Sequence, residues 1–315
     1  MSTSAPTVVR AGGGVTLRWT HRQAVVGMVV CTLLWSIAGV VSRHFQAAQG
    51  FEVTFWRAFF TVVSLVALLS WLRGPATLWR SLRTGGAGLW LSGACWCVMF
   101  VTFMLALTLT TVANVLITMS VGPLFTAISA SVVLRHRLPT RTWAAIVVAG
   151  AGIAWMFASE VSAPGARHLA GIAVALGVPV AAAVNWTLLQ SMRHRESVGG
   201  QAPDMLPAVL LGAVMACAVT LPMALPFAAT GRDLALLALL GSVQLAVPCL
   251  LSVSIARTLS APEISLLGLL EVVFGVAWAW WGAGEAPAGP VLAGGSVVLA
   301  ALALNEAVAL RERAR

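Results

Sequence analysis

The chain has 315 residues, of which 59% are hydrophobic and 9% charged, and its mean hydropathy is +0.93. Soluble domains carry about 25% charged residues, so this composition excludes a soluble globular domain and indicates an integral membrane protein. The net charge of +9 comes from 19 arginines and no lysine, but no basic block carries the interleaved aromatic residues of a nucleic-acid surface, so we expect no nucleic-acid partner.

Long apolar runs predict an all-α membrane protein rather than a barrel. Residues 1–22 are predicted to form a cytoplasmic N-terminal tail, of which residues 1–20 are expected to be disordered. A first half at residues 23–158 and a second half at 169–309 follow, with a cytoplasmic C-terminal tail at 310–315. We predict ten transmembrane helices, at residues 23–43, 51–72, 86–107, 111–134, 141–158, 169–192, 204–227, 233–257, 261–282 and 287–309.

The arginines support this topology through the enrichment of basic residues in cytoplasmic loops. With the N-terminus inside, 15 of the 19 arginines fall in cytoplasmic segments, and only Arg43, Arg167 and Arg232 fall outside. The remaining one, Arg57, lies within the second predicted helix. Both termini are therefore predicted to be cytoplasmic.

A repeat is visible between the two halves. Ala106-Leu-Thr-Leu-Thr at the end of the third helix is echoed 150 residues later by Ala256-Arg-Thr-Leu-Ser at the end of the eighth. Because each half has five helices, the halves must cross the membrane with opposite orientation. Such inverted repeats build a site at their interface near the midplane, which favours a transporter over a receptor or an enzyme.

The ninth predicted helix carries an acid, Glu271, at its midpoint. A carboxylate at the bilayer centre costs roughly 2.5–3.5 kcal/mol on insertion scales. Glu271 is therefore expected to face protein or a water-filled cavity. It either serves a pathway or is a buried acid held by polar partners.

Polar residues at helical spacing mark one face of several other helices. In the fourth helix, Asn114, Thr118 and Gly122 recur at i, i+4 and i+8, which places them on one face, and Pro123 then predicts a kink. The candidates for lining a shared cavity are Trp35, Asn114, Thr118, Asn185, Trp186, Gln244, Ser252 and Glu271. The candidates for a gating or structural role are Arg57, Pro123 and Pro248.

Packing competes with cavity lining at each of these positions. Hydroxyl side chains often join membrane helices through hydrogen bonds of about 0.6 kcal/mol each, so packing is favoured for the threonine and the serine. The amides cost more to bury, so cavity lining is favoured for the two asparagines and the glutamine. The two tryptophans fit either a packed core or a substrate wall.

The sequence gives little support to enzyme chemistry. All five histidines fall in predicted loops or at helix ends, and neither His-Glu-x-x-His nor Gly-x-Ser-x-Gly occurs. The five cysteines show no zinc-site spacing, and a P-loop is absent. We therefore expect no enzyme activity, no cofactor and no metal, which leaves a secondary transporter, a channel or a membrane assembly subunit.

Several motifs, which occur along the chain in the same order as in the family, resemble the EamA-type members of the drug/metabolite transporter superfamily. Those members have ten helices in two five-helix repeats. The motifs are Phe51-Glu-Val-Thr-Phe-Trp-Arg57, Ala106-Leu-Thr-Leu-Thr-Thr-Val-Ala113 with Pro123-Leu-Phe125, and Ala256-Arg-Thr-Leu-Ser-Ala-Pro-Glu-Ile-Ser-Leu-Leu267 with Glu271-Val-Val and Glu285. Two positions depart from the family. Val272 stands where a proline usually follows the acid, and Arg135-His136-Arg137 stands where the first repeat usually has a glutamate.

The resemblance implies a carrier of small metabolites in the bacterial inner membrane, most often an exporter. Within the family the chain is most similar to exporters of amino acids, including aromatic ones. A neutral amino acid would have its charged ends met by Asn, Gln or helix ends. The expected partners are a small-molecule substrate and membrane lipid, and a monomer could contain one complete pathway.

Two alternatives stay open. The same fold could carry an amine, a drug-like cation or a nucleotide-linked metabolite, with Glu271 as the cation or proton acceptor. The chain could also be a non-transporting scaffold or a channel.

Overall fold

The computed structural model describes residues 7–11, 14–42, 44–110, 112–134, 138–156, 166–197, 204–283 and 289–313. Helices make up nearly all of these residues. The first half contains α1 (His21–Ser36), α2 (Ala38–Ser42), α3 (Gly50–Arg73), α4 (Pro75–Thr84), α5 (Gly86–Leu109), α6 (Val112–Met119), α7 (Gly122–Leu134) and α8 (Thr140–Met156). The second half contains α9 (Ala166–Ala175), α10 (Gly177–Ser197), α11 (Pro207–Ala224), α12 (Gly231–Leu239), the π-helix η2 (Leu240–Ala246), α13 (Val247–Ile255), α14 (Ala261–Gly268), α15 (Leu270–Ala283) and α16 (Gly289–Arg313).

The N-terminal tail contains a β-hairpin, and the expectation of disorder over residues 1–20 is wrong there. Strands β1 (Thr7–Ala11) and β2 (Gly14–Arg18) pair antiparallel, with Val9 opposite Thr16. Both segments contain several β-branched residues, which favour strands. The polarity of this region concealed that local pattern.

Among the described residues, seven helices are long and apolar enough to cross a membrane. Helical architecture of the membrane region and multiple candidate spans are therefore confirmed, whereas ten crossings and the inverted repeat stay predictions. The seven candidate spans are His21–Ser42, Gly50–Arg73, Gly86–Leu109, Leu169–His194, Pro207–Ala224, Gly231–Ile255 and Ala261–Trp278.

Several of the predicted helices are interrupted near their middle. The fourth divides into α6 and α7, with Gly122 and Pro123 at the start of α7, and the ninth divides into α14 and α15. In the eighth, Pro248 is the second residue of α13, just after η2, and the Val247 N–H donates to the Ser242 carbonyl five residues back. Because Pro248 has no N–H and its ring crowds the carbonyl four residues earlier, regular α-helical bonding cannot continue through this point.

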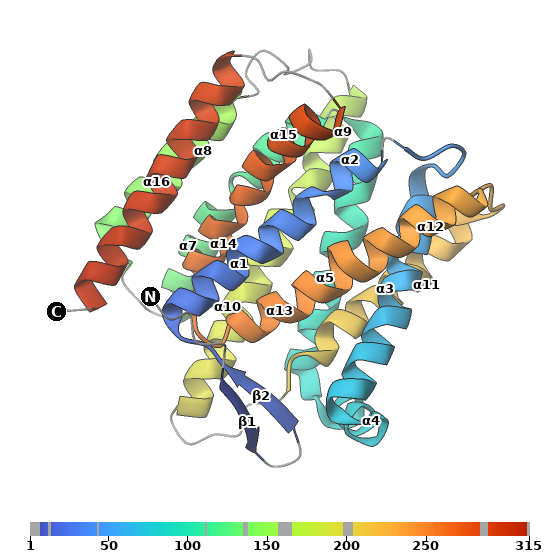
Figure 1. The fold of residues 1–315 in the computed structure, drawn as a ribbon, viewed down its shortest axis with the longest axis horizontal. Coiled ribbons are helices and arrows are strands. Elements are labelled where there is room, and N and C mark those ends of the chain that lie inside the picture. The colour runs from blue at the N-terminus through green and yellow to red at the C-terminus, as the bar shows by residue number, and fades with distance from the viewer. Residues whose placement is uncertain are drawn as a thin grey trace.

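The short amphipathic helix α4 was not predicted. It starts after Gly74, whose φ of +81° is a conformation that glycine adopts without strain, and Pro75 occupies its first turn. Trp79 is exposed, and the Arg83 guanidinium lies 4.7 Å from its ring centroid. Figure 1 shows α4 at one end of α3, beyond the helices of the bundle.

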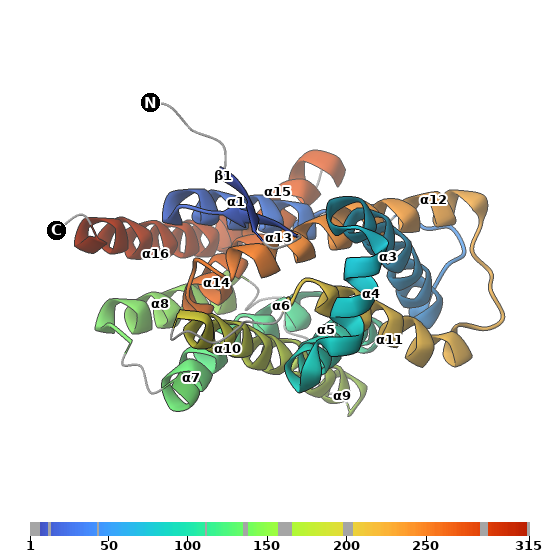
Figure 2. The same cartoon turned by 90° about the horizontal axis from the view of Figure 1, so that it is seen from below.

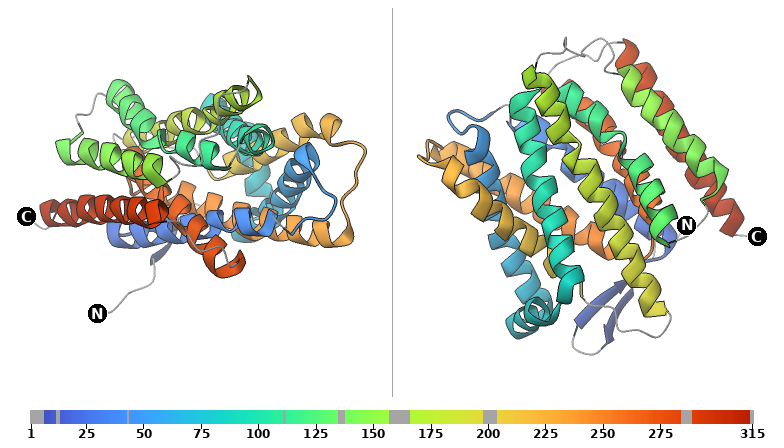
Figure 3. Two further views of the ribbon diagram at one scale, coloured as in Figure 1. Left: turned by 90° about the horizontal axis from the view of Figure 1, so that it is seen from above. Right: turned by 180° about the vertical axis from the view of Figure 1, so that it is seen from behind.

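The helices form two layers, each containing helices from both halves of the chain. Figure 2 shows α1, α13, α15 and α16 in one layer and α5, α7, α8 and α10 in the other. At one edge of the molecule α8 packs against α16, as both views of Figure 3 also show. Elsewhere α3 packs against α11, which in turn packs against α5. The two halves therefore meet both within each layer and between the layers.

Two buried carboxylates join loops of the two halves at the end of the bundle where α2 ends. The Asp233 carboxylate accepts hydrogen bonds from the backbone N–H groups of Gln46 at 2.7 Å, Ala47 at 3.0 Å, Ala48 at 3.2 Å and Thr230 at 3.1 Å. The Glu52 carboxylate accepts from Ala228 at 2.9 Å and Ala229 at 2.8 Å. These bonds stabilise buried charge with oriented backbone dipoles.

Candidate functional site

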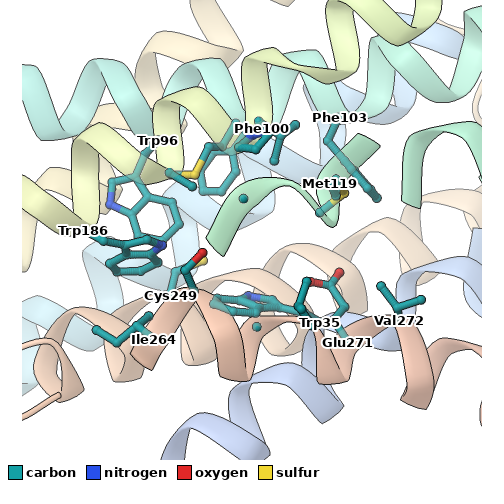
Figure 4. Close-up of a pocket in the computed structure, with 18 of the residues that line it drawn as sticks. Trp35, Trp96, Phe100, Phe103, Met119, Trp186, Cys249, Ile264, Glu271 and Val272 are labelled. Carbon is teal, nitrogen blue, oxygen red and sulfur yellow. The ribbon is translucent and has the colours of Figure 1, made fainter. Parts of the chain in front are cut away.

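A cavity lies between the two layers and is lined by both halves of the chain. The volume of this cavity is about 170 Å³. Figure 4 shows Trp96, Phe100 and Phe103 entering it from one side and Trp35 and Glu271 from the other. The lining residues come from α1, α3, α5, α6, α7, α10, η2, α13, α14 and α15.

Aromatic side chains form one wall of this cavity. Trp96 of α5 and Trp186 of α10 meet edge to face, with ring centroids 5.7 Å apart and planes at 90°. Phe100 lies one turn beyond Trp96, at a centroid distance of 5.6 Å. Phe103 continues the same face of α5. This wall offers flat apolar surface to an aromatic or large aliphatic group.

The opposite wall contains a fixed amide. Gln244 lies in the π-helix η2 and is 4% exposed, and its Nε2 donates a 3.1 Å hydrogen bond to the Trp35 carbonyl. Its Oε1 is buried and has no hydrogen-bond partner among the described residues. Since π-helical turns often occur at functional sites and a buried acceptor normally finds a partner, this oxygen is free to accept a bond from a ligand.

Arg57 of α3 and Glu271 of α15 supply the ionisable groups of the lining. Arg57 is 3% exposed, and its Nε has no hydrogen-bond partner among the described residues. Glu271 lies in the first turn of α15, where the helix dipole favours a negative charge. Among the described residues, no hydrogen bond or ion pair connects these two side chains.

The structure places Trp35, Trp186, Gln244 and Glu271 at the cavity, together with two candidates for gating or structural roles, Arg57 and Pro123. Three further candidates lie elsewhere. Ser252 is fully buried and donates to the Cys249 carbonyl at 2.9 Å. Thr118 is buried but is not among the lining residues, and Pro248 is buried within α13.

Asn185 also lies away from the cavity. Its Oδ1 accepts a 2.6 Å hydrogen bond from Ser92, and both side chains are fully buried between α10 and α5. This polar pair joins two packed helices, which is the structural alternative for a buried amide in a membrane protein. Asn114 is in α6, but its side chain lies outside the described residues.

The main residues that the sequence-based prediction missed are the aromatic and thioether side chains of the lining. Trp96, Phe100 and Phe103 recur at i, i+4 and i+7, which is one face of a helix. That spacing could have identified the wall, but the same pattern also describes ordinary helix packing. Met99 and Met119 line the cavity as well and give it an adaptable surface.

The described residues contain no group of three or more His, Cys, Asp or Glu side chains that could hold a metal ion. The polar side chains of the lining include the Arg57 guanidinium, the Glu271 carboxylate, the Gln244 amide, the Ser265 hydroxyl and the Cys249 thiol, beside the aromatic wall. These groups can bind and orient a small molecule.

Comparisons with known proteins agree with this arrangement. Residues 22–158 match the EamA-like transporter family, so the first half of the chain carries an EamA-like domain. This domain indicates a membrane transporter of small metabolites. A protein of known crystal structure is similar in fold, with a TM-score of 0.72 and 16% identity, over 93% of this chain and 99% of the other. No curated protein matches the chain.

Proposed function

We propose that the whole chain is a secondary transporter that exports neutral and aromatic amino acids, or related small metabolites, across the bacterial inner membrane. The observation that carries this proposal is the cavity between the halves, with its aromatic wall and its few polar groups. Such a lining suits a small ligand with an apolar body and polar ends. One chain contains the complete pathway, so a monomer suffices.

The architecture of the two halves supports an inverted repeat with ten crossings. Helices α6 and α14 are both eight residues long, begin 149 residues apart, and are both followed after a break by a second helix. Packing is matched as well, because α7 contacts α10 while its counterpart α15 contacts α1. Broken helices at the interface of repeats commonly form transporter binding sites.

Hydrogen bonds at both ends of α1 support alternating access. Trp19 Nε1, just before α1, donates to Ser254 at 3.0 Å, and Trp278 Nε1 of α15 donates to Ser36 near the other end of α1 at 3.0 Å. In the proposed topology these contacts lie on the cytoplasmic and outer sides of the cavity. Opening towards either side requires rearrangement of only one of these contacts, while the other keeps the opposite side closed.

The experiment that tests this function is a counterflow screen in proteoliposomes with each of the twenty amino acids. We expect saturable counterflow of labelled Phe, Met or Thr. Absence of counterflow with all three, in protein that is folded and reconstituted, would contradict the proposal.

One observation favours a second candidate, export of an amine or drug-like cation. The Glu271 carboxylate lines the cavity without a hydrogen-bond partner among the described residues, so it could bind a cation or a proton. Glu271→Gln would then abolish transport, whereas it would only weaken transport if the acid supports helix geometry. Uptake of labelled amines by the two proteins distinguishes these outcomes.

A further inference from the structure

We propose that Arg57 and Glu271 recognise the two charges of a zwitterionic substrate. The Arg57 guanidinium binds the α-carboxylate, and the Glu271 carboxylate together with Gln244 Oε1 binds the α-ammonium. This inference rests on the proposed function and names the chemistry by which the same cavity selects amino acids over amines and acids.

The charges that line the cavity favour a ligand with two opposite charges. Arg57 and Glu271 reach the cavity from different halves of the chain and attract each other electrostatically, but no hydrogen bond or ion pair joins them among the described residues. Burial of ions that make no direct pair is costly. A ligand that carries one negative and one positive group satisfies both ions at once and leaves the occupied cavity neutral, whereas an amine or a carboxylic acid satisfies only one of them.

The backbone behind Arg57 is firmly supported. Its carbonyl accepts a 2.8 Å hydrogen bond from Thr61, whose hydroxyl also donates to the Gly241 carbonyl at 3.1 Å. A Cβ at Gly241 would lie 2.6 Å from the Arg57 carbonyl, so α3 is packed directly on the π-helix. A guanidinium on such a fixed base is suited to bidentate recognition of a carboxylate.

Two oxygen acceptors are available to the ammonium group of the substrate. The Gln244 amide is held by its bond to the Trp35 carbonyl, which leaves Oε1 as an oriented acceptor. An ammonium has three donors, so it can bond both to this oxygen and to the Glu271 carboxylate. Trp35 lines the same part of the cavity, and its ring can add a cation–π contact.

Comparison of the halves argues that Glu271 has a role beyond helix geometry. The positions 148 to 150 residues earlier are Pro123, Gly122 and Val121, at the matching break before and at the start of α7, and none of them is an acid. Gly122 also lines the cavity. The break in the repeat therefore forms in one half without a carboxylate, so the fold alone does not account for the carboxylate in the other half.

The test uses three ligands with the same ring, namely phenylalanine, phenethylamine and 3-phenylpropionate, as competitors of labelled phenylalanine counterflow. The wild-type protein should prefer phenylalanine over either single-charge analogue by about 10-fold or more, because charge-assisted hydrogen bonds are the strong ones. Equal competition by phenethylamine would overturn the inference while the proposed function stands. Absence of phenylalanine counterflow would instead overturn the proposed function.

Two variants test which side chain binds the carboxylate of the substrate and which binds its ammonium group. Arg57→Gln should weaken the binding of phenylalanine about 10-fold or more. The binding of phenethylamine should change little, since phenethylamine has no carboxylate to bind. Glu271→Gln should also weaken the binding of phenylalanine, but it should leave the binding of 3-phenylpropionate nearly unchanged. If each variant weakens all three ligands by the same factor, the side chains act structurally and the inference is wrong.

A matched control separates recognition from folding. Glu52→Gln removes another buried carboxylate, one that bonds to the Ala228 and Ala229 backbone away from the cavity. This variant should change thermal stability without changing the preference among the three ligands. Arg57→Lys retains a positive charge, so it should fold even if Arg57→Gln does not, and it should still prefer phenylalanine to phenethylamine. Loss of that preference in Glu52→Gln, or its absence in a folded Arg57→Lys, would contradict the inference.

Discussion

At the scale of single residues, buried charges divide into those that the fold satisfies and those that it leaves for a ligand. Asp233 is fully buried and accepts four backbone hydrogen bonds. Arg57, also buried, faces the cavity with part of its bonding capacity unused. The sequence singled out Arg57 and not Asp233, but it could not show which backbone or side-chain groups would satisfy each buried charge.

Asp233→Ala should markedly lower the thermal unfolding temperature in detergent. The change leaves backbone donors of Gln46, Ala47 and Ala48 without an acceptor, and each unsatisfied buried donor costs about 1–3 kcal/mol. Asp233→Asn keeps one carbonyl oxygen and should recover part of the loss. Equal stability of the alanine variant and the wild type would contradict the structural role of this carboxylate.

Trp186→Ala should raise the half-saturating concentration for phenylalanine more than for threonine. Aromatic pairs contribute about 0.5–1.5 kcal/mol beyond burial, which corresponds to a shift of roughly 2- to 10-fold. Trp186→Phe should restore most of the affinity. Trp71→Ala is the control, because Trp71 is 82% exposed and lies away from the cavity. If the phenylalanine and threonine values shift equally, Trp186 is not a wall for the ring.

At the scale of elements, hydrophobicity located the helices but not their interruptions. Long apolar runs predict where a chain can cross a bilayer, and helices occupy the predicted segments. Pro123 and Pro248 indicated distortions, yet a proline does not determine whether a kink, a break or a π-helix results. Packing decides this, as where α3 lies against Gly241. The sequence-based prediction missed the helix α4 because the polar residues of its exposed face suggested a loop.

Gly241→Ala should destabilise the protein. A Cβ there would lie 2.6 Å from the Arg57 carbonyl and 2.6 Å from the Phe60 Cβ, and overpacking of this kind costs about 1–3 kcal/mol. Gly275→Ala in α15 is the matched control, since its added Cβ has no neighbour within 4 Å. Thermal melts of the two variants should separate clearly. Equal melting temperatures of the two variants would show that the packing of α3 against η2 does not need this close approach.

At the scale of the whole molecule, the repeat and the arginine bias predict ten crossings with both termini inside. In the part of the chain that the structure describes, seven helices qualify as spans by length and composition. The sequence placed the cavity between the halves through the logic of inverted repeats. The sequence could not identify the residues of the aromatic wall. Trp96 lines the cavity and Asn185 packs between two helices because of the neighbours that folding brings to each side chain.

The orientation is testable with single cysteines in a variant that lacks the five native ones. A cysteine at Arg80 should react with a membrane-impermeant maleimide only after the cells are opened, whereas one at Arg232 should react in intact cells. Both positions are exposed, so reactivity reports the side of the membrane. Labelling of both from outside would refute the ten-crossing topology.

The most direct test of transport through this cavity is to fill the cavity. Ala182 of α10 lines it, whereas Val180 of the same helix is 49% exposed and does not. In reconstituted protein of equal thermal stability, Ala182→Trp should abolish phenylalanine counterflow, and Val180→Trp should retain it. Undiminished counterflow by a folded Ala182→Trp protein would show that the substrate takes another route.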